Sequence, residues 1–437
     1  MIRQLDQLEE RLQPQWWLAP ATLFCLVVGS TMVAAAWQSD SAFWLYGTPK
    51  FIAAKHLFLA GGIMVAFAIG SRLASVTGKK PKATPESAEP YIAIWFWISV
   101  VLTFFGYAAW VSVGLKNGFS LAAFRELLTT DDPHFAEELH LNVFTTIQGV
   151  TTCTQFGIAA VPMGIWLFFR GHGKVIWAIA AIISLAFLRA IVFSERLAVI
   201  ELLVPAAVVT LRMGFLGKKS SSGRRWLFEL APLLGLVLLL VFFGAFEYFR
   251  SWRYYRYEFD SYSQFILWRF AGYYTTAHNN SAMALETRDL YPLPFTTVQS
   301  LWILAGIFNK ALRYTAVTGI DPDASHLAML DQFGTAELNN EGGLFQPALD
   351  YGLAGMLIFW CLCGFISGRA YRAFLARNVA GILLYPLIFL AILETPRFLY
   401  LTYTRSLPPV ALLAIVSAIA VYNKKRMPEW EALPATA

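Results

Sequence analysis

Long apolar stretches separated by short polar segments follow one another along almost the whole chain. A helix crosses a bilayer with about 20 mainly apolar residues, and about ten stretches approach or exceed that length. They lie at about 16–37, 51–71, 91–113, 143–169, 175–193, 197–213, 227–248, 344–367, 379–396 and 406–422. The pattern predicts an all-α polytopic membrane protein with about ten transmembrane helices, forming a single integral membrane domain over residues 1–437.

The composition supports this class. Of the 437 residues, 57% are hydrophobic and only 14% are charged, whereas a soluble domain carries about 25% charged residues. The net charge of +6 is explained by basic cytoplasmic loops, so no nucleic-acid partner is expected. The cysteines all fall in apolar stretches without zinc-ligand spacing, and we expect neither a disulfide framework nor a metal site.

The charges of the short loops predict the orientation in the membrane. Short loops rich in Lys and Arg lie on the cytoplasmic side. If both termini are cytoplasmic, five such segments all fall on the cytoplasmic side. They are "SRLASVTGKKPK" (71–82), "RGHGK" (170–174), "GKKSSSGRR" (217–225), "RAYRAFLAR" (369–377) and "NKKR" (423–426).

Two longer segments then lie outside the cytoplasm. Segment 114–142 has mixed charge and is expected to contain a short surface helix. Segment 249–343, between the seventh and eighth spans, is rich in aromatic residues and is expected to fold as a partly helical extracytoplasmic loop. Within it, residues 296–314 fit either an amphipathic helix at the interface or a re-entrant segment.

Charged residues interrupt one apolar region, "LRAIVFSERLAVIELLVP" (188–205). A charge near the bilayer centre costs roughly 2.5–3.5 kcal/mol, and such residues usually face a water-filled cavity on a substrate path. Arg189, Glu195, Arg196 and Glu201 are therefore candidates for a site. In the alternative, the turn lies in water, Arg189 reaches toward the surface, and Glu201 pairs with an arginine.

The predicted outer face carries further arginines, although this face usually lacks them. Arg250, Arg253 and Arg256 are spaced three apart, which would form one ridge on a helix leaving the seventh span. Arg269 follows in the same loop, and Arg397 and Arg405 lie near the outer end of the ninth span. Arginine binds phosphate through a planar fork of donors. The tyrosines and tryptophans between them suit sugar rings or an interfacial aromatic belt.

Together these features predict an outward-facing, arginine-lined cavity beside lipid. Its ligand would combine a hydrocarbon tail, a phosphate-bearing head and a polar group beyond the head. A polyprenyl-diphosphate-linked sugar meets all three requirements.

Three segments resemble bacterial O-antigen polymerases, also called oligosaccharide repeat-unit polymerases, which are related to O-antigen ligases. They are "SERLAVIELLVPAAV" (194–208), "WRFAGYYTTAHNNSA" (268–282) and "ELNNEGGLFQPALDYGLAGMLIFWCLCGFISGRAYR" (337–372). The last contains a pattern of the type N-x-x-G…D-[YF]-G-x-x-G, formed by Asn340, Gly343, Asp350, Gly352 and Gly355. The resemblance covers roughly residues 185–375.

The resemblance implies a metal-independent membrane glycosyltransferase that needs no cofactor. It would polymerise undecaprenyl-diphosphate-linked oligosaccharide repeat units on the outer face of the bacterial cytoplasmic membrane, making O-antigen, capsule or exopolysaccharide. A flippase and a chain-length regulator are the expected protein partners. The alternatives are an O-antigen ligase-type transferase, which passes finished polymer to another acceptor, and a transporter or flippase for lipid-linked oligosaccharides. The chain lacks the internal repeats of many transporters.

The predicted site residues follow from these chemical needs. The expected substrate ligands are Arg189, Arg196, Arg269 and Arg397, with Arg250, Arg253 and Arg256 as a second tier and Asn340 from the motif. Glu341 is the leading candidate for the base that takes the acceptor hydroxyl proton, ahead of Glu195 and His278. Each candidate base has a structural alternative: a helix cap for Glu341, an ion pair with Arg196 for Glu195, and a solvated loop position for His278. Asp350 is expected to hold a broken helix end, and the glycines around it to permit close packing.

Overall fold

Helices form all the regular structure in the described part of the chain. The computed structural model describes residues 15–77, 81, 88–129, 142–145, 147, 149–193, 196–215 and 229–423, and these ranges contain no strand. Within these described ranges, seven helical segments are long and apolar enough to cross a membrane. They are α2 (Pro20–Trp37), α4 (Ala54–Val76), α5 (Glu89–Lys116), η4 with α8 (Thr151–Phe168), the Val175–Val192 part of α9 (Val175–Phe193), α10 with most of η5 (Leu197–Gly214), and α18 (Gln346–Leu375). The protein is an all-α, membrane-embedded protein.

Three shorter apolar helices occupy the remaining predicted stretches. They are α12 (Ala231–Glu247), α19 (Val379–Glu394) and α20 (Leu407–Asn423), of 17, 16 and 17 residues. Each of the ten predicted stretches therefore contains a helix. The count of ten spans stays a prediction, because seven of these segments reach full spanning length.

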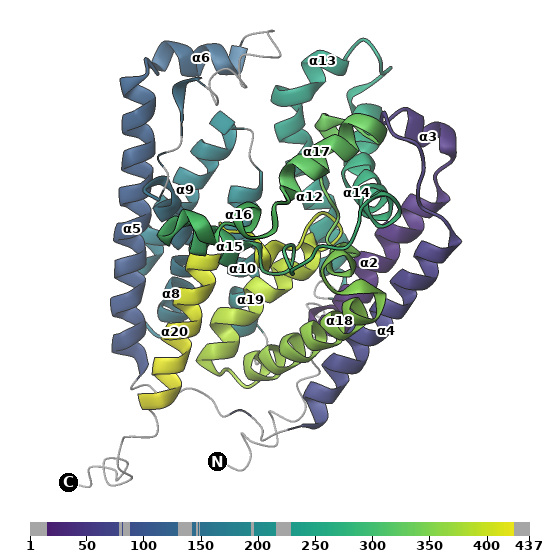
Figure 1. Ribbon diagram of the computed structural model, residues 1–437. Coiled ribbons are helices and arrows are strands. Elements are labelled where there is room, and N and C mark those ends of the chain that lie inside the picture. Colours follow the sequence, from purple (N-terminus) through teal and green to yellow (C-terminus); the bar gives the residue numbers. More distant parts are fainter. Residues whose placement is uncertain are drawn as a thin grey trace, which may run out of the picture.

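The outer surface of the bundle suits contact with lipid. On α5, which forms one edge of the molecule in Figure 1, Ile94, Trp97, Val101 and Phe105 are all exposed and lie on one stripe. The opposite face of the same helix buries Phe96 and other residues against neighbouring helices. A helix that is apolar all round in this way needs an apolar solvent on its outer side.

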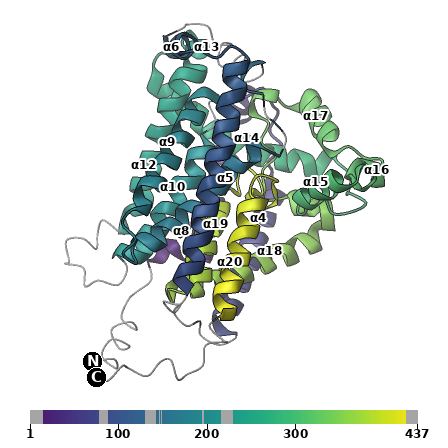
Figure 2. The same ribbon diagram turned by 90° about the vertical axis from the view of Figure 1, so that its left-hand side faces the viewer.

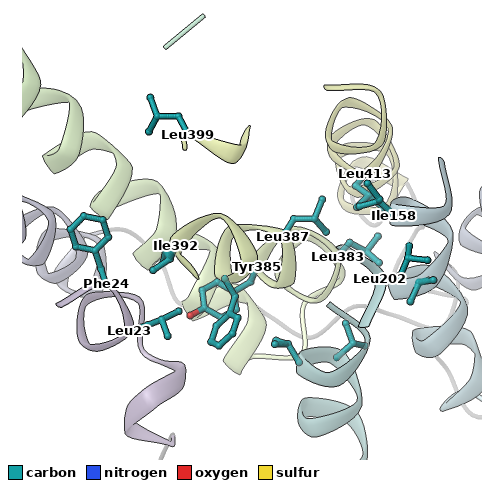
Figure 3. Packing of buried hydrophobic residues seen from close by; sticks show 14 of the residues in the cluster. Leu23, Phe24, Ile158, Leu202, Leu383, Tyr385, Leu387, Ile392, Leu399 and Leu413 are labelled. Carbon is teal, nitrogen blue, oxygen red and sulfur yellow. The ribbon is translucent and has the colours of Figure 1, made fainter. Parts of the chain in front are cut away.

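The core surrounds α19, which is buried on most of its sides. Leu383, Tyr385, Leu387 and Ile392 of this helix meet side chains from four neighbouring helices (Figure 3). The partners are Leu23 and Phe24 of α2, Ile158 of α8, Leu202 of α10 and Leu413 of α20. This central packing fixes the position of the segment that follows α19, which carries Arg397.

The predicted extracytoplasmic loop is largely helical, and its first long helix belongs to the bundle. Helix α14 (Tyr262–Thr287) packs against α2 and α12, because apolar residues such as Phe265, Ile266 and Met283 are buried along it. Buried polar residues between them lower its overall hydropathy, and for that reason the apolar pattern alone did not identify it as part of the bundle. Helices α15 (Gln299–Phe308), α16 (Tyr314–Thr318) and α17 (Pro322–Phe333) project to one side (Figure 2).

Segment 114–142 contains the expected short helix, α6 (Leu121–Thr129), and residues 130–141 lie outside the described ranges. Its side of the membrane, like that of segment 249–343, remains a prediction.

Helix α18 is broken near its start. The sequence analysis predicted such a break, with Asp350 bonding the broken end. Gly352 has φ +70° and ψ 177°, which interrupts the helix. The carboxylate of Asp350 accepts hydrogen bonds from the backbone amides of Phe295, Thr296 and Thr297 at 2.8–3.1 Å, and from two of their hydroxyl groups. Asp350 therefore has a structural role: it ties the end of the first helical section to the 295–297 segment.

Candidate functional site

Three arginines from three separate elements surround the ring of Tyr273 in α14. Arg196 precedes α10, Arg269 lies on α14, and Arg397 follows α19. Their guanidinium carbons lie 4.7, 5.4 and 5.7 Å from the ring centroid, within the range of a cation–π contact. The fold thus brings together three of the four arginines predicted as primary substrate ligands.

Three glutamates balance these cations. Glu247, fully buried at the end of α12, lies 2.6 Å from Arg196 Nη1 and 3.5 Å from Arg269 Nε. Glu337 lies 2.7 Å from Arg269 Nη2, and Glu394 lies 2.8 Å from Arg397 Nη1. We call these six charged residues and Tyr273 the arginine cluster. Such pairing is what makes burial of the charges tolerable, since an unpaired buried charge is strongly destabilising.

Sequence reasoning missed the three glutamates. Two of them carried a usable signal, because Glu247 and Glu394 each close an apolar helix. An acidic residue is unfavourable at the negative end of the helix dipole, so its presence there indicates a cation nearby.

Glu337 is the most accessible member of the cluster. Its side chain is 43% exposed, whereas that of Arg269 is 1% exposed. The hydroxyl of Tyr255 donates a 2.6 Å hydrogen bond to Glu337. Burial raises the pKa of Tyr255, and the adjacent carboxylate raises it further, so the phenol stays protonated as a donor.

Arg189, the fourth predicted ligand, belongs to a different group. It donates to Thr154 Oγ1 at 2.9 Å, and with Arg405 and Glu201 it lines a cavity of about 10 Å³. That volume holds a single water molecule at most. Arg405 pairs with Glu201 at 2.8 Å, so the predicted alternative in which Glu201 pairs with an arginine is found.

The second-tier arginines lie where α12 continues beyond Glu247. The helix passes through a π-helical turn, η6 (Tyr248–Trp252), into α13 (Arg253–Tyr255). The wider turn changes the angular spacing of residues within it, and the ridge of Arg250, Arg253 and Arg256 stays a prediction. The side chain of Arg250 lies outside the described residues, while Arg256 is exposed and lies over Tyr257.

The segment that carries Glu341 is fixed beside Arg397 by backbone hydrogen bonds. The Gly342 amide donates to the Arg397 carbonyl and the Gly343 amide to that of Thr395, both at 2.9 Å. From the other side, the Ser281 hydroxyl donates to the Gly342 carbonyl at 3.1 Å. Segment 337–343 is thus held between α14 and the segment after α19.

The motif "HNNS" in α14 therefore contributes anchors. The Asn280 amide donates to the carbonyls of Leu338 and Asn340 at 2.9 and 3.0 Å. Asn340, predicted as a substrate ligand, takes part in this hydrogen bond through its backbone carbonyl. Asn279 holds residues 48–52 through four hydrogen bonds of 2.7–3.3 Å. The two asparagines of this motif, which the sequence analysis did not single out, thus position two loops.

Among the candidate bases, Glu341 precedes Gly342, whose backbone amide is hydrogen-bonded to Arg397 of the arginine cluster. Its side chain is 28% exposed, one oxygen accepts a hydrogen bond from Gln346, and the other lies 3.6 Å from His326 Nδ1. His278 is fully buried, and its Nε2 lies 2.9 Å from the Thr31 hydroxyl in α2, which excludes a solvated loop position. Glu195 lies outside the described residues.

A larger cavity, of about 320 Å³, lies beside α17. The end of α14, the following loop and α17 enclose it, with Arg288, Asp289, Tyr291, Ser325, Gln332 and Phe333 among its lining residues. Its lining combines the rings of Tyr291 and Phe333 with several hydrogen-bonding groups. Within the described ranges, no three His, Cys, Asp or Glu side chains lie close enough together to hold a metal ion.

No family model, curated protein or solved structure matches the chain.

Proposed function

We propose that the protein is a polysaccharide polymerase that joins undecaprenyl-diphosphate-linked repeat units at the outer face of the bacterial cytoplasmic membrane. The observation that carries the proposal is the arginine cluster. Arg196, Arg269 and Arg397 come from three distant parts of the sequence and meet around one ring, beside the segment that carries Glu341.

A diphosphate would bind by replacing a carboxylate. Arg269 is buried between Glu247, which is fully buried, and Glu337, which is partly exposed. Because Glu337 is 43% exposed, it can turn outward into water as an incoming phosphate takes over its place on Arg269. Two oxygens of a phosphate can accept a bidentate pair of hydrogen bonds from the guanidinium fork, as the two oxygens of a carboxylate do. Glu337 thus keeps Arg269 oriented until substrate arrives.

The transfer itself needs charge neutralisation and one proton acceptor. The acceptor hydroxyl oxygen forms a bond to the anomeric carbon of the growing chain, and the bond from that carbon to the diphosphate oxygen breaks. The electron pair leaves with undecaprenyl diphosphate, whose developing charge the arginines stabilise. Glu341 takes the hydroxyl proton. Since diphosphate is already a good leaving group, the residues present suffice without a metal.

The surroundings suit the other parts of the substrate. Lipid at the bundle surface accommodates the undecaprenyl tail, and the 320 Å³ cavity beside α17 offers room for a sugar of the acceptor repeat unit. A flippase would deliver the repeat units to this face, and a chain-length regulator would act on the product.

A gel of surface polysaccharide from a deletion strain tests the proposal. We expect loss of polymer and accumulation of products bearing a single repeat. Full-length polymer that lacks only its final acceptor would instead identify a ligase. Repeat units that remain on the cytoplasmic side would identify a flippase.

Complementation with variants tests the cluster. Compared at equal protein level, Arg196→Ala and Arg269→Ala should each reduce polymer by about 10²–10³-fold, as loss of one transition-state donor does, while single-repeat product persists. Arg313→Ala is the matched control, because Arg313 is an exposed arginine outside the cluster. Normal chains from Arg196→Ala and Arg269→Ala would remove both residues from the site.

A further inference from the structure

His326, which sequence reasoning did not single out, is held in one tautomer. Its ring lies on α17 and is 10% exposed. The ring Nε2 lies 3.1 Å from the backbone carbonyl of Asn339. A carbonyl oxygen only accepts, so Nε2 carries the hydrogen of this bond. In the neutral ring, Nδ1 is then a bare acceptor.

This bare nitrogen points at the carboxylate of Glu341. The distance from Nδ1 to Glu341 Oε1 is 3.6 Å, and Nδ1 makes no hydrogen bond to any described residue. The other carboxylate oxygen is already bonded to Gln346. Nδ1 and Oε1 are therefore two hydrogen-bond acceptors that lie close together, and a proton placed between them would form a hydrogen bond. Hydrogen bonds at catalytic sites are often long before substrate binds.

We propose that His326 and Glu341 act as one proton-accepting pair, with His326 as the positioning residue. This inference rests on the proposed function. When the acceptor hydroxyl attacks the anomeric carbon, its O–H bond breaks and the proton passes to Glu341 Oε1. The lone pair of Nδ1 then accepts a hydrogen bond from the new carboxylic acid. Because that bond favours the protonated form, the carboxylate becomes a better base.

The other ionisable groups near the pair come from three parts of the fold. Asp323 lies on α17 itself, Tyr291 in the loop after α14, and Arg397 and Tyr403 in the segment after α19. Burial raises the pKa of both tyrosines above the ordinary value, and neighbouring carboxylates, including that of Glu341, raise it further. Both tyrosines therefore stay neutral at physiological pH, and the arginine stays charged. Asp323 is the remaining charged group on α17, so the pH profile needs a control variant at this residue.

Two substitutions of His326 separate proton sharing from anchoring. In His326→Gln, the amide nitrogen reaches the former Nε2 position and keeps the bond to Asn339, while Nδ1 is lost. In His326→Asn, a polar atom remains near the Nδ1 position and the anchor is lost. The assay is the pH dependence of polymer formation by the purified protein in lipid vesicles, with undecaprenyl-diphosphate-linked repeat units as substrate and Asp323→Asn as the control.

We expect His326→Gln to lower the plateau rate at least about tenfold and to move the acid limb of the profile down by about one pH unit, a tenfold change in proton binding. Asp323→Asn should leave the limb in place. A normal profile for His326→Gln combined with a poor one for His326→Asn would mean that His326 only anchors Asn339, which overturns the proposal.

A second measurement does not depend on polymerase activity. NMR of the ¹⁵N-histidine-labelled protein reports the hydrogen bonding of the two His326 ring nitrogens directly. The amide of Glu341→Gln can donate a hydrogen bond to Nδ1, which the carboxylate cannot, so the Nδ1 resonance of His326 should shift in this variant, and Glu337→Gln should leave it unchanged. An unchanged resonance in Glu341→Gln would refute the pair. A vesicle assay without product, alongside a shifted resonance, would instead refute the proposed function alone.

Discussion

Alanine in place of Gly342 should destabilise the protein far more than the same change at Gly319. Both glycines have positive φ, +66° and +73°, and an alanine there costs roughly 1–2 kcal/mol of conformational strain. A Cβ added to Gly319 would meet no atom within 4 Å, whereas one added to Gly342 would lie 2.3 Å from the Ala277 carbonyl oxygen. Gly319→Ala therefore measures the strain alone.

The extra cost at Gly342 comes from the hydrogen bonds around it. Ordinary contact begins near 3.4 Å, so the segment must move about 1 Å away from α14. That shift weakens the bond from the Gly342 amide to Arg397 and the bond from Ser281 to the Gly342 carbonyl. At about 1 kcal/mol each, the two bonds bring the total for Gly342→Ala to roughly 3–4 kcal/mol, about 2 kcal/mol more than for Gly319→Ala.

Unfolding of both variants in lipid nanodiscs, followed by tryptophan fluorescence and circular dichroism under identical conditions, checks this difference. Gly342→Ala should also lose polymer in complemented cells, since the displaced segment carries Glu341, and Gly319→Ala should not. Equal destabilisation by the two substitutions would refute the close contact between segment 337–343 and α14.

Three further predictions address other parts of the structure. Asp350→Asn should destabilise the protein by about 1–3 kcal/mol, because either orientation of the amide leaves a backbone N–H of the 295–297 segment unpaired. Glu247→Gln should destabilise by about 3–5 kcal/mol by leaving buried guanidinium groups without their carboxylate, and adding Arg196→Gln should recover about 1–3 kcal/mol. The last prediction uses a background without the native cysteines. There, Leu327→Cys, at a position 53% exposed, should react with an impermeant thiol reagent in intact spheroplasts. Lys174→Cys, at an exposed position, should react only after lysis.

Each of these has a distinct contrary result. Wild-type stability of Asp350→Asn in the nanodisc unfolding assay would mean that the carboxylate does not hold the 295–297 segment. Strictly additive effects of the Glu247 and Arg196 substitutions in that assay would show that the two residues do not form an ion pair. Labelling of Lys174→Cys before lysis would invert the predicted topology.

The sequence predicted the apolar helices well, because each backbone polar group in lipid must be satisfied within its own helix, and this imposes long uniform apolar stretches. Helix α14 was harder to identify. Its buried His278, Asn279 and Asn280 make hydrogen bonds to α2 and to two loops, so its polar residues reflect tertiary contacts that no local pattern encodes.

The arginine cluster could be anticipated in part from the sequence, and its role as a site stays a prediction. Arginines on the expected outer side are unusual for a membrane protein, and this local signal selected Arg196, Arg269 and Arg397. Their meeting at Tyr273 depends on the packing of α10, α14 and α19, which sequence spacing does not determine. Their counter-charges were missed for the same reason. Arg189 shared the signal but lies in a second group with Arg405, because it precedes the turn that carries Arg196.

The most direct test is turnover by the purified protein in vesicles that contain undecaprenyl-diphosphate-linked repeat units and a metal chelator. The expected result is polymer, one released undecaprenyl diphosphate for each new linkage, and loss of both products in Arg269→Ala but not in Arg313→Ala. Equal turnover by Arg269→Ala and the wild type, or release of the lipid without any new linkage, would contradict the role assigned to the arginine cluster.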